Sequence, residues 1–247
     1  MLIELLHWLA TPAPLAHRRR GYVRESVLLW SRSRRCRAAW AEHLERSRAA
    51  VAAACAGLER RRTAVVLGSG LLQDVPLAHL AERFSAVHLV DAVHLWPARR
   101  AARAFPHVRL ITADLTGLSG GDDPLAALCG GEAVDLVVSA NVLSQLPILP
   151  LDRPGPQPPD LGRRIVHAHL DGLARLDARV CLLTDMEQVE EDRAGRITDR
   201  LDLLHGVRLG QPDQCWTWEL APFGEAARDR RQRHAVHAFL DWRGPAT

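Results

Sequence analysis

The stretch Thr63-Ala-Val-Val-Leu-Gly-Ser-Gly70 places two glycines directly after a short apolar run, and Ala86-Val-His-Leu-Val-Asp91 ends a second apolar run in a carboxylate. Glycine leaves the backbone bare for close approach by a ligand, and a carboxylate after the next strand accepts hydrogen bonds from ribose hydroxyls. Together the two segments predict an α/β fold that binds a cofactor containing adenosine.

The size and composition of the chain are those of a folded domain with a sizeable core. It has 247 residues, of which 47% are hydrophobic, and a net charge of +3. Five scattered cysteines form no CxxC pair, which favours a reducing compartment over a disulfide framework. The short apolar stretch Met1–Ala10 contains Glu4 and His7 and predicts a small amphipathic helix rather than a signal peptide. We therefore expect a cytoplasmic protein with no membrane segment.

Positive charge is concentrated near the N-terminus. Between His17 and Arg62, 13 Arg against 4 Glu give a net charge of +9. Apolar residues at helical spacing and an alanine-rich stretch predict one or two long helices over residues 22–58. We expect residues 1–60 to form a helical, Arg-rich extension and residues 61–247 to form an α/β domain. A basic helical segment can bind nucleic acid, or pair with the mildly acidic remainder of the chain.

Strands and helices alternate after residue 63, and the five predicted strands are short and apolar, as in a parallel sheet covered on both faces. The polar residues 186–206 predict a helix. Cys215–Leu220 and His234–Asp241 predict two further strands that pair antiparallel. The expected fold class is α/β, with a doubly wound, mostly parallel seven-stranded sheet, an antiparallel C-terminal strand and an N-terminal helical extension.

Four segments in this order resemble the motifs of the class I S-adenosylmethionine-dependent methyltransferases, over about residues 60–247. They are Val66-Leu-Gly-Ser-Gly70, Asp91, Asp114 in Thr112-Ala-Asp-Leu115, and the fourth-strand segment 134–146. The resemblance implies a Rossmann-like fold, S-adenosylmethionine as cofactor, Asp91 on the ribose and Asp114 on the adenine. The cofactor-binding residues that it implies are Gly68, Ser69, Gly70, Asp91, Ala92, Asp114, Leu115 and Asn141.

The glycine turn also separates this cofactor from a dinucleotide. A dinucleotide site prefers a third glycine that brings the following helix close to a pyrophosphate. Here Leu72 stands where the last of the spaced glycines would be, and Gln73 and Asp74 follow it. A carboxylate repels pyrophosphate but tolerates the sulfonium and amine of S-adenosylmethionine, so the sequence favours the methyl donor. Leu72 is the departure that can weaken cofactor binding.

The acceptor side is less specific in sequence. Methyl transfer requires mainly that donor and acceptor are aligned, and we assign no catalytic residue. An Asn-Pro-Pro-aromatic tetrapeptide is absent after the fourth strand, so the segment is more similar to small-molecule methyltransferases. The substrate-contact candidates are Tyr22, Arg24, Asp74, Ser144 and Gln145. Asn141, Ser144 and Gln145 can equally cap a turn and begin a helix, and Tyr22 can simply pack.

Three further pairs of residues have both a functional and a structural interpretation. Asp185 and Glu187, placed just after the fifth predicted strand, can act as general bases or cap a helix. The tryptophans Trp216 and Trp218 predict packing rather than a substrate cage. His234 and His237 point to opposite faces of a strand, so no metal site is predicted.

The function expected from the sequence is methyl transfer from S-adenosylmethionine to an unidentified small molecule, with the N-terminal helices lidding the site as the resemblance implies. Two alternatives stay open: a catalytically silent binding protein of the same fold, and an RNA methyltransferase guided by the basic helices. The acceptor atom, the pathway and the oligomeric state are not determined by the sequence.

Overall fold

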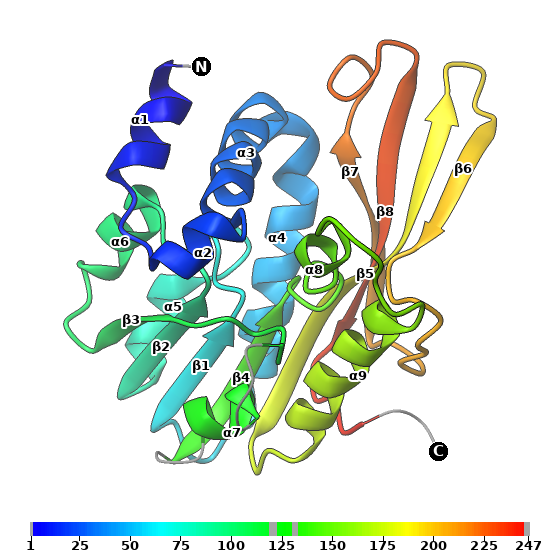
Figure 1. Ribbon diagram of the computed structural model, residues 1–247. Helices are drawn as coiled ribbons and strands as arrows, with labels where there is room; N and C mark the ends of the chain where they lie inside the picture. Colours follow the sequence, from blue (N-terminus) through cyan, green and yellow to red (C-terminus); the bar gives the residue numbers. More distant parts are fainter. Residues whose placement is uncertain (1, 119–122, 130–132, 245–247) are drawn as a thin grey trace.

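The computed structural model describes residues 2–118, 123–129 and 133–244. Its centre is a sheet in the order β3-β2-β1-β4-β5-β8-β7, with β6 paired to the outer half of β5 (Figure 1). The strands are β1 (Thr63–Leu67), β2 (Ala86–Asp91), β3 (Val108–Thr112), β4 (Val134–Ala140), β5 (Arg179–Asp192), β6 (Ile197–Asp202), β7 (Gln214–Ala221) and β8 (Arg230–Phe239). β1 to β5 are parallel, and β8 runs antiparallel to β5 and β7. The doubly wound fold class and the antiparallel ending are confirmed.

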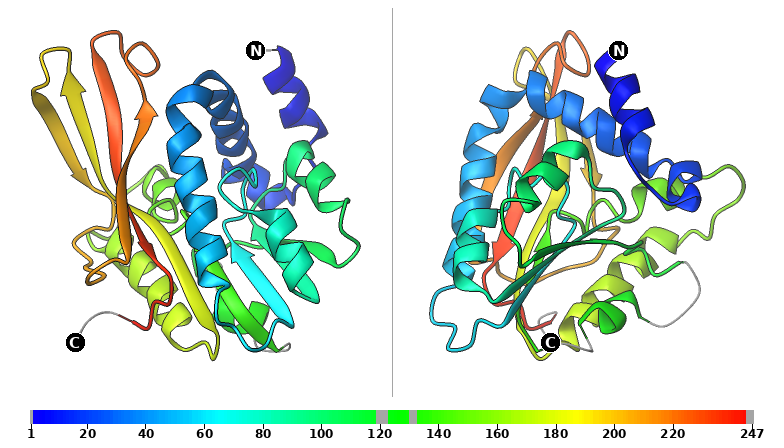
Figure 2. Two further views of the ribbon diagram at one scale, coloured as in Figure 1. Left: turned by 180° about the vertical axis from the view of Figure 1, so that it is seen from behind. Right: turned by 90° about the vertical axis from the view of Figure 1, so that its left-hand side faces the viewer.

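Helices cover both faces of the sheet. They are α1 (Leu2–Ala10), α2 (Leu15–Arg19), α3 (Tyr22–Arg35), α4 (Arg37–Ala54), α5 (Leu77–Arg83), α6 (Trp96–Ala102), α7 (Pro124–Cys129), α8 (Ile148–Leu151) and α9 (Leu161–Ala174). Figure 2 shows α4 and α5 over one face, and α7 and α9 lie over the other. Within the described ranges, no helix is long and apolar enough to cross a membrane.

β1 shows how a continuous apolar run serves two cores. Ala64 and Val66 pack into the core shared with α4 and α5, whereas Val65 and Leu67 pack into the core shared with α9. Side chains of a strand alternate between faces, so a strand covered on both sides must be apolar throughout. The five residues of β1 are all buried and follow this rule, and the glycine turn begins directly after them.

The sequence prediction of a helix over residues 186–206 is wrong. β5 continues through this segment, the chain turns at Gly195 (φ +79°), and β6 returns along it, which adds an eighth strand. The carboxylate of Glu191 accepts a hydrogen bond from Arg231 at 2.6 Å and also pairs with Arg233 across the ladder. Opposite charges on neighbouring strands stabilise pairing, so polarity here reflects cross-strand ion pairs rather than an exposed helix.

The N-terminal segment divides into two parts. α4 belongs to the covering layer of the sheet, because its residues share one core with β7 and β8. α1, α2 and α3 lie across the carboxyl ends of the parallel strands (Figure 2). Val23 and Val27 of α3 are buried against Val93 and Leu95, which follow β2. The first helices are therefore attached to the edge of the sheet where ligands of such folds bind.

Candidate functional site

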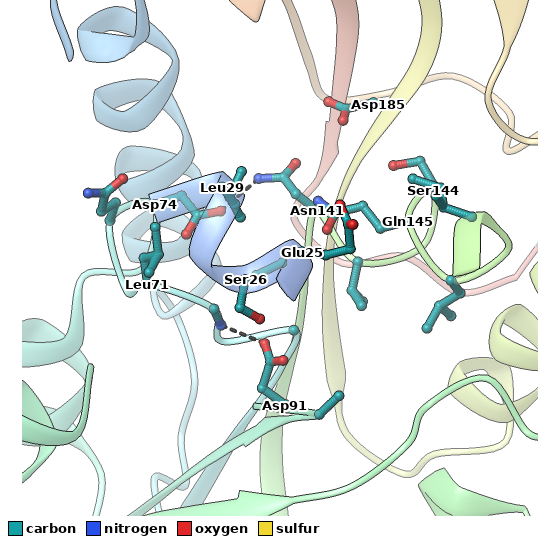
Figure 3. Close-up of a pocket in the computed structure, with 18 of the residues that line it drawn as sticks. Glu25, Ser26, Leu29, Leu71, Asp74, Asp91, Asn141, Ser144, Gln145 and Asp185 are labelled. Atoms are coloured by element: carbon teal, nitrogen blue, oxygen red, sulfur yellow. Dashed lines mark hydrogen bonds between the residues drawn. The ribbon is translucent and has the colours of Figure 1, made fainter. Parts of the chain in front are cut away.

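A cavity of about 400 Å³ lies at the carboxyl ends of β1, β2, β4 and β5 and is covered by α3 (Figure 3). Its wall combines the glycine turn after β1, the acid that ends β2 and the segment after β4 with side chains of α4, β7 and β8. This is the edge at which doubly wound sheets bind ligands, and the volume falls within the roughly 300–1,000 Å³ of small-molecule sites.

The glycine turn needs glycine for two reasons. Gly68 (φ +73°) and Gly70 (φ +47°) adopt left-handed conformations that side chains disfavour. A Cβ on Gly68 would lie 2.4 Å from the Cβ of Val142 and 3.1 Å from the carbonyl oxygen of Ala140. The amides of Gly68 and Ser69 both donate to the carbonyl of Val90, which joins the turn to the end of β2. The turn is thus held between two strands, with bare backbone facing the cavity.

Asp91 is the acid of the cavity floor. Its Oδ2 accepts a hydrogen bond from the amide of Gly70 at 2.7 Å (Figure 3). Its Oδ1 accepts one from the amide of Val93 at 3.3 Å. Burial raises the pKa of this carboxyl above its ordinary value, and the two amide bonds only partly oppose that. A carboxylate accepts about four hydrogen bonds, so Asp91 can still receive donors from a ligand in the cavity.

Asp74 and Asn141 form the middle of the wall. The side-chain amide of Asn141 donates to Asp74 at 2.8 Å (Figure 3). The backbone amide of Asn141, at φ +51°, donates to the carbonyl of Leu183. Burial raises the pKa of Asp74, because the hydrogen bond from Asn141 only partly compensates for lost hydration. Ser144 and Gln145 line the same wall after β4. The left-handed turn at Asn141 fits a residue type that tolerates this conformation.

Asp114 is held by the N-terminal segment. Its carboxylate accepts hydrogen bonds from Arg20 at 2.5 Å, from the hydroxyl of Tyr22 at 3.0 Å and from the hydroxyl of Thr116 at 2.7 Å. Burial, followed by the Asp114 charge, raises the pKa of Tyr22. The side chain of Asp114 is only 5% exposed and does not line the cavity, although Leu115 beside it does.

The structure brings together ten of the thirteen residues predicted for the site. The cavity wall contains Gly68, Gly70, Asp91, Ala92, Leu115, Asn141, Tyr22, Asp74, Ser144 and Gln145. The other three lie elsewhere. Ser69, within the turn, is buried, Asp114 pairs with Arg20, and the side chain of Arg24 is 75% exposed and lies 3.8 Å from Glu25.

Asp185 and Glu187 do not follow β5, as the sequence suggested, but lie within it. A β-bulge at Met186 separates them, because Asp185 pairs with Val236 while Glu187 pairs with Ala235. A bulge inserts one residue and turns the next side chain to the other face. Asp185 therefore lines the cavity, whereas Glu187 pairs with Arg200 at 2.6 Å.

Sequence reasoning missed the far end of the cavity, opposite Asp91. Here His43 of α4, Trp218 of β7 and His234 of β8 meet Asp185. The imidazole of His43 stacks on Trp218 with ring centroids 4.1 Å apart, and Nδ1 of His234 lies 3.1 Å from Oδ2 of Asp185. Burial lowers the pKa of His43 to about 4. No spacing in the chain signals this cluster, because four separate elements supply it.

Much of the N-terminal positive charge is used within the molecule. Arg35 forms a two-pronged pair with Glu225, at 2.6 Å for the closest contact, and Arg32 lies 3.7 Å from the same carboxylate. Arg18 donates to the carbonyls of Trp8 and Thr11. Among the described residues, no group of three or more histidine, cysteine or acidic side chains is placed to hold a metal ion.

No family model matches the sequence, and no curated protein matches it either. Solved structures resemble it in fold. A 1,6-didemethyltoxoflavin N1-methyltransferase from Burkholderia thailandensis, with S-adenosylhomocysteine bound, is 17% identical over 92% of both chains, with a TM-score of 0.46. The N-methyltransferase NodS from Bradyrhizobium japonicum, also with S-adenosylhomocysteine, is 12% identical over 79% of this chain and 86% of its own, with a TM-score of 0.41.

A third solved structure, an S-adenosylmethionine-dependent methyltransferase from Leishmania major, is 15% identical over 95% of this chain and 81% of its own, with a TM-score of 0.41. These solved structures are methyltransferases of the kind that the sequence motifs resemble. At such identities and scores the likeness carries nothing about the activity or ligands of this chain. Its function is therefore inferred below from its own residues.

Proposed function

We propose that this protein is a methyltransferase that uses S-adenosylmethionine and acts on a small molecule. The observation that carries the proposal is the hydrogen bond between the glycine turn and Asp91. Bare backbone at Gly68 and Gly70 and a buried carboxylate with remaining acceptor capacity share one cavity wall. An adenosine with a charged tail matches both features, because ribose offers two donors and the tail requires close approach to the backbone.

The residues present fit the cofactor along the length of the cavity. Asp91 would accept from the ribose hydroxyls, and Ala92 and Leu115 would flank the adenine. Asp74, held by Asn141, would accept from the ammonium of the methionine part. When bound, the sulfonium supplies a methyl group that is already activated for displacement. The chain's own task is then to align the acceptor with that carbon and to exclude water.

We further propose that α1, α2 and α3 form a lid over this cavity. Tyr22 lines the cavity and also donates to Asp114, and Arg20 pairs with the same carboxylate. His17 lies 2.8 Å from the carbonyl of Ala92 through its Nδ1. These contacts fix the lid on the adenine side. A covered cavity of this volume supports a small acceptor rather than a polymer.

One observation favours a second candidate, a binding protein of this fold without transferase activity. Asp114, which the family resemblance assigns to adenine, is already satisfied by Arg20, Tyr22 and Thr116. A carboxylate engaged by a cation within the chain has less to offer to a cofactor. In this candidate the N-terminal segment permanently replaces the contact that adenine would make.

Calorimetric titration with S-adenosylhomocysteine tests the proposal. We expect binding, and we expect Asp91→Asn to weaken it about tenfold or more, because a hydrogen bond to a charged acceptor contributes roughly 1.5–3 kcal/mol. The asparagine can still accept from the Gly70 amide, so the turn is kept. Asp171→Asn, an exposed residue of α9, is the matched control and should not change the affinity.

Two results would contradict the proposal. A folded protein that does not bind S-adenosylhomocysteine at millimolar concentration would favour the second candidate. Equal affinities for the wild type and Asp91→Asn would show that the ribose hydroxyls of the ligand do not bind the carboxylate of Asp91. Thermal unfolding of each variant establishes that the protein is folded.

A further inference from the structure

Several buried polar atoms of the cavity wall have no hydrogen-bond partner among the described residues. They are Oδ1 of Asp185, Nε1 of Trp218, Nδ1 of His234, Oδ1 of Asn141 and Oγ of Ser144. Buried polar groups in native proteins are almost always hydrogen-bonded, so a cluster of unpartnered ones on a cavity wall is available to a ligand or to water. Asp185 lies beyond Asp74 and Asn141, at the end of the cavity away from Asp91 (Figure 3).

His234 lies beside Asp185 in the cavity wall. Nδ1 of His234 lies 3.1 Å from Oδ2 of Asp185, and Nε2 of the same ring lies 3.1 Å from the amide oxygen of Gln188. Only the contact to Gln188 is a hydrogen bond, and both Nδ1 of His234 and Oδ1 of Asp185 are left without a hydrogen-bond partner within the described part of the chain. Asp185 is only 2% exposed, so any group that meets Oδ1 does so away from bulk water.

The groups around Asp185 donate hydrogen bonds and present flat surfaces. Nδ1 of His43 accepts from the indole nitrogen of Trp216 at 3.1 Å. The neutral ring therefore carries its proton on Nε2. His43 stacks on Trp218 at an interplanar angle of 8°, and Trp40 meets Trp218 edge to face with centroids 4.9 Å apart. This end of the cavity combines one carboxylate acceptor, two N–H donors and aromatic walls.

We infer that the far end of the cavity is the acceptor subsite, and that it takes a flat nitrogen heterocycle with a ring N–H, whose proton passes to Asp185. The inference rests on the proposed function and names its substrate class. Oδ1 of Asp185 accepts from the ring N–H. The donors Nε1 of Trp218 and Nε2 of His43 are complementary to acceptor atoms of the same ring system.

The transfer step balances with these groups alone. A second ring nitrogen attacks the methyl carbon with its lone pair, the carbon–sulfur bond breaks, and its electron pair stays on sulfur. The heterocycle would become cationic, and it stays neutral because the N–H bond yields its proton to Asp185 while its electrons return to the ring. The products are a methylated heterocycle, S-adenosylhomocysteine and a proton, which Asp185 releases to solvent when the product leaves.

The same geometry disfavours an alkyl amine as acceptor. A buried carboxylate stabilises an ammonium ion, which has no lone pair with which to attack the methyl group. A ring N–H is neutral near neutral pH and becomes acidic only as positive charge develops on the ring. Asp185 therefore assists the heterocycle in the transition state, where assistance raises the rate.

Benzimidazole is the probe that tests the inference, and 1-methylbenzimidazole is its matched control, because it keeps the ring but lacks the N–H. The wild-type protein is first saturated with S-adenosylhomocysteine, and each probe is then titrated by calorimetry. We expect benzimidazole to bind about tenfold more tightly than its methylated form, as expected for a hydrogen bond to a carboxylate. With S-adenosylmethionine, benzimidazole should yield 1-methylbenzimidazole, detected by mass spectrometry.

Asp185→Asn is the decisive variant. It should remove the preference for benzimidazole and lower kcat for its methylation at least tenfold, while the affinity for S-adenosylhomocysteine stays unchanged. Asp199→Asn, an exposed residue of β6, carries the same chemical change outside the cavity and should behave as the wild type. If Asp185→Asn does not fold, the preference of the wild type between the two probes still decides.

The outcomes separate this inference from the proposed function. If S-adenosylhomocysteine binds but benzimidazole does not, binds no better than 1-methylbenzimidazole, or is not methylated, the inference is overturned and the proposed function stands. Equal kcat in Asp185→Asn and the wild type overturns the proton transfer to Asp185. If S-adenosylhomocysteine itself does not bind, both fail together.

Discussion

The two ends of the cavity are built in different ways. At the end beside Asp91, a ligand meets the backbone of a turn that directly follows β1 and the acid that ends β2. At the end beside Asp185, a ligand meets side chains from α4, β5, β7 and β8. The first end is local in sequence and consists largely of main chain. The second depends on the order of strands in the sheet and on one β-bulge.

This difference separates the parts of the site that can vary from those that cannot. Backbone amides keep their positions whatever the neighbouring side chains are, as long as the turn forms. The far end can be rebuilt by changing side chains on a sheet that stays the same. We therefore expect changes at the first end to affect the fold and the cofactor together, and changes at the second to affect stability or the acceptor without affecting the cofactor.

The largest expected effect is that of Gly68→Ala. The new Cβ would lie 2.4 Å from that of Val142, at a φ of +73°. Strain in the left-handed region and overpacking together should lower the free energy of unfolding by about 3 kcal/mol. Gly57→Ala is the control, because Gly57 (φ +69°) has no atom within 4 Å of the new Cβ. It should cost only about 1 kcal/mol in urea denaturation, and equal losses would contradict the close approach of β4 to the turn.

His43→Leu should affect stability without affecting the cofactor. It leaves the indole N–H of Trp216 without its partner at 3.1 Å, and an unsatisfied buried donor costs about 2 kcal/mol. The affinity for S-adenosylhomocysteine should stay within about twofold of the wild type. His167→Leu, on the exposed side of α9, should change neither quantity. A large loss of cofactor affinity in His43→Leu would show that the two ends are coupled.

Cofactor binding should weaken as the pH falls. Burial raises the pKa of Asp91 and of Asp74, and the cofactor requires both as carboxylates. Protonation therefore competes with binding, and the affinity for S-adenosylhomocysteine should begin to fall at a pH where an ordinary carboxyl would still be ionised. In the protein without ligand the same two groups contribute stability at low pH that is lost as the pH rises through their raised pKa.

Asp91→Asn provides the check on this pH dependence. Calorimetric titration across the range should give a shallower slope for the variant than for the wild type, because one of the two titrating groups is gone. Parallel slopes would assign the pH dependence to groups other than Asp91.

The smallest expected effect is that of Leu72→Gly. Leu72 stands at the left-handed φ of +59° and packs partly against the core of α4 and α5, outside the cavity wall. Relief of backbone strain and loss of packing oppose each other, so the free energy of unfolding should change by less than about 1 kcal/mol. S-adenosylhomocysteine affinity should change less than about twofold, whereas Leu71→Gly, which removes a cavity-wall side chain, should weaken it more. Substantially tighter binding by Leu72→Gly would show that Leu72 does narrow the cofactor site.

The local sequence predicted the strands well where a continuous apolar run marks each of them. Parallel neighbouring strands end at the same edge of a sheet, so the glycine turn after β1 and Asp91 at the end of β2 could be predicted from the sequence to lie together. The helix prediction for residues 186–206 was wrong because the polar side chains of this segment pair with residues of β8, which lie outside the local sequence. Glu187 lies outside the site for a related reason, because the bulge at Met186 places its side chain on the opposite face of the sheet from that of Asp185.

The sequence by itself determined the doubly wound fold, the turn at Gly68 and the acid at Asp91, because burial periodicity and glycine conformation act over neighbouring residues. Only the tertiary structure decided that Asp114 meets Arg20 rather than the cavity, and that Asp185 meets His234. Such contacts join residues far apart in the chain. Their positions follow from how helices and strands pack, since β8 lies between β5 and β7 and α3 lies over the carboxyl ends of the strands.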